Sequence, residues 1–296
     1  MPTSSTDAPV GAPAPAPTPL PPAARSEGLA TWRAVEYGVV PGFRPLLLDV
    51  VRPDSAAELP LVVFLHGGGW RVGSRSAMGP MFAGWAPSPF AELAAAGFAV
   101  ASLDYRLSGE AGFPAPLDDV RAGLSWLDDH AGELGLARGR RALWGESAGG
   151  HLAALAALTG PGVRAVVDWY GPADLTALAQ DAAATGISIT EPGAPDSREA
   201  LLLGGPVADR PDAARAASPV AHVHADAPPF LLRHGTADRF VPARQSERLG
   251  EALRRVGAPV RVDLVEGADH MWLGDPHAAR TAFDASVAFL TDHLTA

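Results

Sequence analysis

Residues 141–158 read RALWGESAGGHLAALAAL, an apolar run that leads into GESAG at 145–149 and continues with small and apolar residues. The run before the motif predicts a buried strand, and the Ala- and Leu-rich run after it predicts a helix. A serine at such a sharp strand-to-helix turn has its hydroxyl raised above the sheet, and flanking glycines leave room where side chains would clash. The helix N-terminus also favours a developing anion. This stretch therefore predicts a nucleophile at Ser147.

On both sides of this stretch, short apolar runs that end in Gly or Asp alternate with helical patterns. Several runs are apolar throughout, as strands buried on both faces of a parallel sheet tend to be. The predicted strands are 61–65, 98–103, 142–144, 165–169, 230–233 and 260–265. The predicted helices are 117–127, 148–158 and 281–294. We therefore predict an α/β fold with a mostly parallel central sheet flanked by helices.

The chain has 296 residues, a length that an α/β fold can reach as one unit. Residues 1–28 contain a Pro- and Ala-rich tract, which predicts a disordered tail, and residues 29–296 are predicted to form a single catalytic domain. Residues 176–218 form a long connection rich in Ala, Pro, Gly and Asp. Because so long a connection inside a compact domain is usually functional, we predict a short cap or lid there.

Composition excludes several kinds of function. The 23 Lys and Arg residues are scattered and outnumbered by 33 Asp and Glu residues, a net charge of −10, which argues against a nucleic-acid partner. The absence of cysteine excludes thiol nucleophiles, disulfides and thiolate zinc sites. There is no apolar window of about 18 residues and no basic, apolar signal segment near Met1. We therefore expect no membrane partner and a cytoplasmic location.

A second motif, HGGGW at 66–70, follows the predicted strand 61–65. Acyl transfer passes through a tetrahedral oxyanion, and preorganised backbone amides aimed at that oxygen lower the barrier. Glycines allow the backbone to come this close. We predict that the amides of Gly68, Gly69 and Ala148 form an oxyanion hole.

A serine nucleophile needs an imidazole base, and the base needs a carboxylate that orients it. Where the serine lies on a strand-to-helix turn, the chain order is Ser, then Asp or Glu, then His. In the C-terminal third, Asp238 follows the strand 230–233 and His270 follows the strand 260–265. Both loops should leave the carboxyl edge of the sheet, where Ser147 emerges. We predict Asp238 as the orienting acid and His270 as the base.

Other polar residues near these loops are alternatives. Asp174 also follows a strand and is the rival to Asp238 as the orienting acid. His234 lies closer to a strand and is predicted to be structural, and His151 is predicted to lie on a helix face. Asp269 is adjacent to His270, and adjacent side chains diverge. Asp104 is predicted to tie a loop near the oxyanion turn.

Aromatic residues after the oxyanion turn predict the rim of a substrate pocket. We expect Trp70, Phe82 and Trp85, together with residues of the 176–218 segment, to surround a short or aromatic acyl group.

The chain resembles α/β-hydrolases of the hormone-sensitive-lipase-like esterase group, and in particular bacterial esterases of the feruloyl and acetylxylan esterase type and arylformamidases. The resemblance runs from about residue 32 to the end and is carried by HGGGW, LDYRL, FPAPLDDVRAGLSWL, GESAGGHLAAL, HGTAD and GADH. It implies a serine carboxylic-ester hydrolase with Ser147 as nucleophile, His270 as base and Asp238 as orienter. It implies no cofactor and no metal. Met271 and Trp272 stand where relatives often have a small residue.

The resemblance leaves several functions open. An arylformamidase or other amide hydrolase would use the same triad on a different small molecule. A protein of another class, a non-catalytic binding scaffold, could have the same fold. A lipase acting at membranes would need a large apolar lid. The Pro and Asp content of residues 191–212 argues against such a lid. The expected partner is a small-molecule ester, and the expected assembly is a monomer or homodimer.

Overall fold

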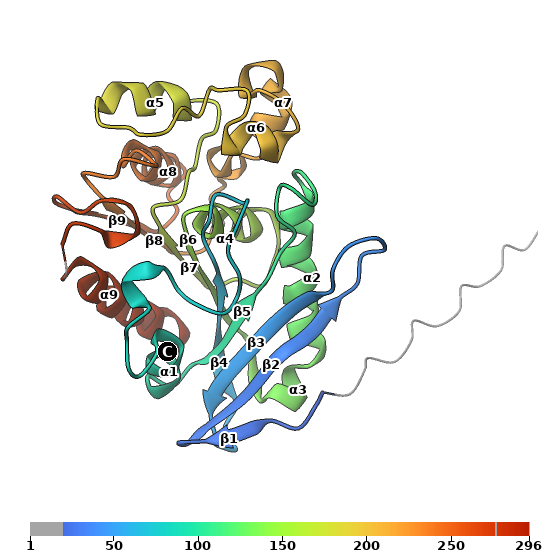
Figure 1. Cartoon of the computed structure of the whole chain (residues 1–296). Coiled ribbons are helices and arrows are strands. Elements are labelled where there is room, and N and C mark those ends of the chain that lie inside the picture. The colour runs from blue at the N-terminus through green and yellow to red at the C-terminus, as the bar shows by residue number, and fades with distance from the viewer. Residues whose placement is uncertain (1–19, 276, 296) are drawn as a thin grey trace, which may run out of the picture.

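The computed structural model of the chain describes residues 20–275 and 277–295. Within these residues, nine strands form one sheet in the order β1-β2-β3-β5-β4-β6-β7-β8-β9 (Figure 1). The strands are β1 (Ala24–Ser26), β2 (Leu29–Gly38), β3 (Leu46–Pro53), β4 (Leu59–Leu65), β5 (Ala99–Leu103), β6 (Leu136–Glu146), β7 (Ala165–Trp169), β8 (Phe230–Gly235) and β9 (Val260–Val265). Pairing is antiparallel from β1 through β2 and β3 to β5, and parallel from β5 through β4 to β9. The predicted α/β fold with a mostly parallel sheet is confirmed.

Helices cover both faces of the sheet (Figure 1). They are α1 (Pro89–Ala95), α2 (Ala115–Asp129), α3 (Ala131–Leu134), α4 (Ala148–Thr159), α5 (Leu178–Thr185), α6 (Arg198–Leu203), α7 (Pro211–Ala216), α8 (Arg244–Arg255) and α9 (Ala278–Leu294). Short 3-10 turns are η1 (Pro80–Phe82), η2 (Val207–Asp209), η3 (Pro219–His222) and η4 (His270–Trp272). Among the described residues, no helix combines the length and apolar character needed to cross a membrane.

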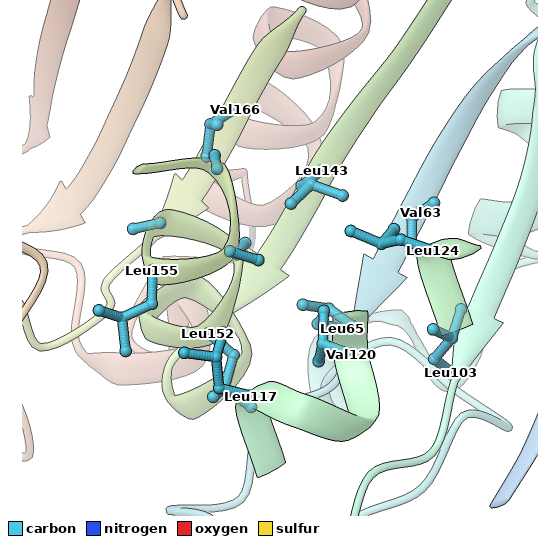
Figure 2. Packing of buried hydrophobic residues seen from close by; sticks show 14 of the residues in the cluster. Val63, Leu65, Leu103, Leu117, Val120, Leu124, Leu143, Leu152, Leu155 and Val166 are labelled. Atoms are coloured by element: carbon cyan, nitrogen blue, oxygen red, sulfur yellow. The ribbon is translucent and has the colours of Figure 1, made fainter. Parts of the chain in front are cut away.

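Alternation along the central strands divides the core into two layers. In β4, Val63 and Leu65 pack with side chains of α2 and α4, as Figure 2 shows. The intervening Val62 and Phe64 pack on the opposite face with side chains of α1 and α9. Successive residues of a strand point to opposite faces, so a strand covered on both sides must be apolar throughout. This explains the continuous apolar runs of the central strands.

The helix after GESAG is buried along nearly its whole length. Every residue of α4 from Ala148 to Leu158 is buried, and a helix that is apolar all round belongs inside a protein. Small side chains let it lie close to the sheet and to α2. Its burial holds the turn at Ser147 on a rigid support.

The N-terminal edge differs from the prediction. Strand β1 lies inside the segment 1–28 that was predicted to be disordered, and its backbone pairs with β2. All three of its side chains are exposed, so backbone pairing forms the strand without any apolar pattern. Trp32 also donates a hydrogen bond from Nε1 to the Pro21 carbonyl at 3.1 Å. The prediction is thus corrected for residues 20–28, and residues 1–19 lie outside the described part of the chain.

The segment 176–218 contains the three short helices α5, α6 and α7, which gather at one end of the molecule (Figure 1). A partly buried ion pair attaches α5 to the main body. Asp181 of α5 accepts hydrogen bonds at 2.7 Å from Arg248 Nε and Gln245 Nε2 of α8. The segment is therefore held against the main body, and Arg198 of α6 lies close to the turns that follow β4 and β8.

Candidate active site

Ser147 lies at the junction of β6 and α4 with φ 53° and ψ −120°, a conformation that L-residues rarely adopt. The neighbouring glycines are required by close backbone contacts. A Cβ on Gly145 would lie 2.1 Å from the Gly149 carbonyl oxygen, and a Cβ on Gly149 would lie 2.0 Å from the Leu65 carbonyl oxygen. The turn is further held by a hydrogen bond from Ser147 N to Trp169 O at 2.8 Å. These contacts fix the direction of the Ser147 hydroxyl.

The structure brings the predicted serine, histidine and aspartate together. Ser147 follows β6, Asp238 follows β8 and His270 follows β9, so all three leave the same edge of the sheet. His270 Nε2 is 3.0 Å from Ser147 Oγ, and His270 Nδ1 is 2.6 Å from Asp238 Oδ2. These are hydrogen-bonding distances, and they form a continuous line from the carboxylate to the hydroxyl.

The surroundings of Asp238 keep it ionised. Burial acts to raise the pKa of Asp238, but hydrogen bonds from His234 and His270 outweigh it and hold the pKa well below its ordinary value. Its Oδ1 accepts two further hydrogen bonds, from the amides of Phe240 and Val241, both at 2.8 Å. Because the carboxylate accepts from His270 Nδ1, that nitrogen carries the ring proton, and Nε2 presents its lone pair to the serine hydroxyl.

His234 and the other rival residues have structural contacts. His234 is fully buried, with Nδ1 2.7 Å from Ser246 Oγ and Nε2 3.2 Å from Asp238 Oδ2. Asp174 caps its own turn by accepting a hydrogen bond from Thr176 N at 3.1 Å. Asp269 accepts a hydrogen bond from His270 N at 2.7 Å and also pairs with Arg239. It therefore fixes the backbone of the histidine loop rather than the imidazole.

Two aromatic rings hold the imidazole of His270. The Tyr170 ring centroid is 4.6 Å from that of His270, and the Phe240 centroid is 5.3 Å from it. Met271 lines the cavity beside Ser147, whereas Trp272 is fully buried and packs against Trp169 and Tyr170. Of the two bulky residues after His270, only Met271 can narrow the space for a substrate.

The oxyanion turn follows β4 and has a left-handed backbone at Gly68 (φ 111°), Gly69 (φ 60°) and Trp70 (φ 56°). A Cβ on Gly68 would lie 2.1 Å from the Val72 carbonyl oxygen, so this close turn requires glycine. Gly68, Gly69 and Ala148 all line the cavity beside Ser147. Within residues 20–275 and 277–295, none of their amides donates a hydrogen bond to another residue. All three amides are therefore available to an oxygen in the cavity.

Two buried side chains brace this turn. Trp70 donates from Nε1 to His151 Nδ1 at 3.2 Å, and His151 Nε2 donates to the Ala217 carbonyl at 2.6 Å. Burial lowers the pKa of His151 to about 4, so the ring is neutral. His151 lies on α4, as predicted, and its buried ring is an internal bridge between the oxyanion turn and the end of the 176–218 segment. Asp104 ties the same loop, as predicted, through Arg75 Nη1 at 2.6 Å.

The structure removes two of the predicted substrate contacts. Phe82 and Trp85 pack against each other at 4.8 Å between ring centroids, and each also packs against Phe283 of α9. Phe82 is only 3% exposed and stacks on Trp169. The turn η1 carries the Phe82 ring into the core, and the partly buried Trp85 ring lies between Phe283 and Arg280 of α9; neither residue lines the cavity. Trp70 does line the cavity, as predicted.

The cavity next to Ser147 has a volume of about 310 Å³. It is lined by Gly67, Gly68, Gly69, Trp70, Arg71, Val72, Glu146, Ser147, Ala148, Tyr170, Pro172, Arg198, Glu199, Phe240, Val241, His270 and Met271. Part of the wall was not predicted from the sequence, namely Tyr170, Phe240, Glu146 and the side chains of α6. Position in the sequence was an available signal for three of them: Glu146 lies within GESAG, Tyr170 directly follows the predicted strand 165–169, and Phe240 lies two residues after the predicted acid.

Glu146, the residue before the nucleophile, connects three loops from a buried position. Its carboxylate accepts hydrogen bonds from Gly67 N at 3.3 Å, Gly79 N at 3.1 Å and Tyr170 Oη at 3.4 Å. Burial raises the pKa of Glu146 to about 7, against the lowering effect of these donors. The residue thus supports the oxyanion turn and the tyrosine that packs on His270.

The chain is similar to known proteins in both sequence and fold. The sequence model of the BD-FAE family matches residues 48–253, which is more than half of the chain. The chain is 33% identical over 241 residues to esterase LipQ of Mycobacterium tuberculosis, covering 76% of this chain and 53% of LipQ. It is also 33% identical over 266 residues to the probable carboxylic ester hydrolase LipM of the same organism, covering 83% of this chain and 57% of LipM. The chain thus spans little more than half the length of these two relatives.

Among solved structures, the fold is similar to a truncated form of a carbohydrate esterase from gut microbiota. The TM-score is 0.76 at 26% sequence identity, and the match covers 90% of this chain and 96% of that structure. The described sheet and helices therefore account for nearly all of that esterase structure.

Proposed function

This chain belongs to the BD-FAE family of α/β-hydrolases, and from that membership we propose that it is a serine carboxylesterase acting on esters of small or aromatic acyl groups. The observation that carries the proposal is the hydrogen-bonded line from Asp238 through His270 to Ser147 at the wall of a cavity. The esterase names of its relatives support the same reaction.

In the first half of the reaction, Ser147 attacks the ester carbonyl while His270 Nε2 takes its proton. Asp238 stabilises the imidazolium that forms, because its own low pKa keeps it ionised. The carbonyl oxygen becomes an oxyanion, which the amides of Gly68, Gly69 and Ala148 stabilise. His270 then gives the proton to the departing alcohol, and an acyl-enzyme remains.

In the second half, water attacks the acyl group with His270 again acting as base. The proton passes from water to Nε2 and then to Ser147 Oγ as the acid product leaves. The aromatic rings of Tyr170 and Phe240 hold the imidazole in place through both halves.

A p-nitrophenyl ester series from acetate to decanoate tests the proposal, with Ser147→Ala as the control. We expect turnover of the short esters and its loss in the variant, because a cavity of about 310 Å³ has little room for a long chain. Activity retained by Ser147→Ala, or no ester turnover by folded protein, would refute the proposal. In the second case, an N-formylated aromatic amine would test amide hydrolysis by the same residues.

A further inference from the structure

The cap places an arginine directly over the oxyanion turn. Arg198 is the first residue of α6, and its aliphatic part covers Gly69 so closely that a Cβ on Gly69 would lie 2.4 Å from Arg198 Cδ and 3.0 Å from Nε. Its guanidinium lies over the ring of Phe240, 5.3 Å from the centroid. That ring in turn packs on His270. The positive charge therefore lies between the oxyanion turn and the base, at the wall of the cavity.

This guanidinium has no acidic partner in the part of the chain that the structure describes. Neither Arg198 nor Arg71, the second arginine on the cavity wall, takes part in an ion pair or a side-chain hydrogen bond among residues 20–275 and 277–295. Neighbouring arginines do find partners: Arg239 pairs with Asp269, and Arg248 pairs with Asp181. Both arginines thus line the cavity, and neither uses its guanidinium donors in a contact with the described residues.

The carboxylates on the same wall do not neutralise them. Glu146 is occupied by the amides of Gly67 and Gly79 and by the Tyr170 hydroxyl. Glu199 is buried, and that burial raises its pKa, outweighing the lowering effect of the nearby Arg198 charge. Burial likewise raises the pKa of Glu146 to about 7. The cavity therefore presents more positive than negative charge to a ligand.

We propose that Arg198, assisted by Arg71, binds a carboxylate carried by the ester substrate, so that the enzyme prefers acidic esters to neutral ones of the same size. A guanidinium binds a carboxylate through two parallel N–H donors, which gives both affinity and orientation. Arg198 lies close enough to the oxyanion turn for one substrate to contact both. This inference rests on the proposed esterase function and names its substrate class.

Two matched pairs of substrates test the preference and locate the carboxylate. The first pair is p-nitrophenyl hemiglutarate and p-nitrophenyl valerate, which differ in charge at the end of the acyl chain. The second pair is 4-acetoxybenzoate and phenyl acetate, which differ in charge on the leaving group. For at least one pair, we expect wild-type kcat/KM to be higher for the acidic ester, and the pair that shows the preference identifies the side of the ester that carries the anion.

The variant Arg198→Met removes the charge and keeps the aliphatic cover over Gly69. We expect it to reduce the ratio of kcat/KM between the acidic and neutral esters by about 10- to 100-fold, the usual range for a lost hydrogen bond to a charged group. Arg215→Met is the matched control, because Arg215 is an exposed cap arginine outside the cavity and its loss changes the net charge equally. This control should leave the ratio unchanged. Raising the salt concentration should reduce the wild-type preference.

Several outcomes would overturn the inference. A wild-type enzyme without preference in either pair, or an equal loss on acidic and neutral esters in Arg198→Met, would mean that Arg198 only covers Gly69 and Phe240. If Arg198→Met does not fold, as judged by circular dichroism, Arg198→Gln provides the same charge removal and is subject to the same criterion. Hydrolysis of the neutral esters that depends on Ser147 would uphold the esterase function even where the charge preference fails.

Discussion

Replacing Asp238 by asparagine changes one atom of the site and tests the orientation of His270. The Oδ1 atom of Asp238 accepts hydrogen bonds from the amides of Phe240 and Val241, both at 2.8 Å. An amide nitrogen at this position would face two donors, so the asparagine must keep its oxygen there. Its NH₂ group then points to His270 Nδ1, where the wild-type carboxylate oxygen lies at 2.6 Å.

The expected loss follows from the tautomer of His270. Facing an NH₂ donor, Nδ1 must act as an acceptor, and the ring proton moves to Nε2. An Nε2 that carries a proton cannot accept the one from Ser147, 3.0 Å away. Comparable tautomer reversal in a serine protease lowers kcat about 10⁴-fold, equal to about 5 kcal/mol in the barrier. We expect a loss of this order in kcat for Asp238→Asn, with a much smaller change in KM.

The assay is steady-state hydrolysis of p-nitrophenyl acetate by the wild type, by Asp238→Asn and by Asp174→Asn. The last variant is the matched control, because Asp174 is the rival acid from the sequence and its contact with Thr176 survives as an amide. It should keep wild-type kcat to within about twofold, since it touches no reacting group. Near-identical circular dichroism spectra of the three proteins would establish that all are folded.

Two results would refute this reasoning. If Asp238→Asn kept kcat within about tenfold of the wild type, the orientation of His270 would not depend on this carboxylate. If Asp174→Asn lost as much activity as Asp238→Asn, the orienting acid would have been assigned to the wrong loop.

Three other changes test the packing around the site. Gly149→Ala should lower the free energy of unfolding in urea by about 3 kcal/mol or more, because its Cβ would lie 2.0 Å from the Leu65 carbonyl oxygen. In the control Gly84→Ala the new Cβ has nothing within 4 Å, so the free energy of unfolding should change by no more than about 0.5 kcal/mol. Equal urea midpoints for the two variants would contradict the clash. Phe82→Ala should lower the free energy of unfolding by about 3–5 kcal/mol and leave the dependence of ester turnover on acyl-chain length unchanged. A change in that dependence would mean that Phe82 contacts the substrate. The pKa of Glu146 is raised to about 7 in the folded protein, so folding favours its protonated form. The free energy of unfolding of the wild type relative to Glu146→Gln should therefore fall by up to about 3 kcal/mol as pH rises from 4.5 to 7. A difference that does not depend on pH would refute the raised pKa.

Local pattern was enough to predict the central sheet and the turn at the nucleophile. Strands covered on both faces are apolar throughout, so β4, β7 and β8 could be recognised from short runs of sequence. The turn at Ser147 requires glycines within two residues on each side, and such close contacts leave a motif that can be read directly. The distant Asp238 and His270 could be predicted because parallel strands deliver their following loops to one edge of the sheet.

Features that depend on side-chain direction or on distant partners were decided by the tertiary structure alone. Phe82 and Trp85 follow the oxyanion turn in sequence, yet both rings pack against Phe283 of α9 and neither lines the cavity. Strand β1 forms by backbone pairing, which leaves no apolar signature. Arg198 reaches the oxyanion turn only because the segment 176–218 returns to the edge of the sheet. Sequence thus determined the fold and the chemistry expected of it, because both rest on local backbone geometry and chain order, whereas the shape and charge of the cavity arise from segments that meet only on folding.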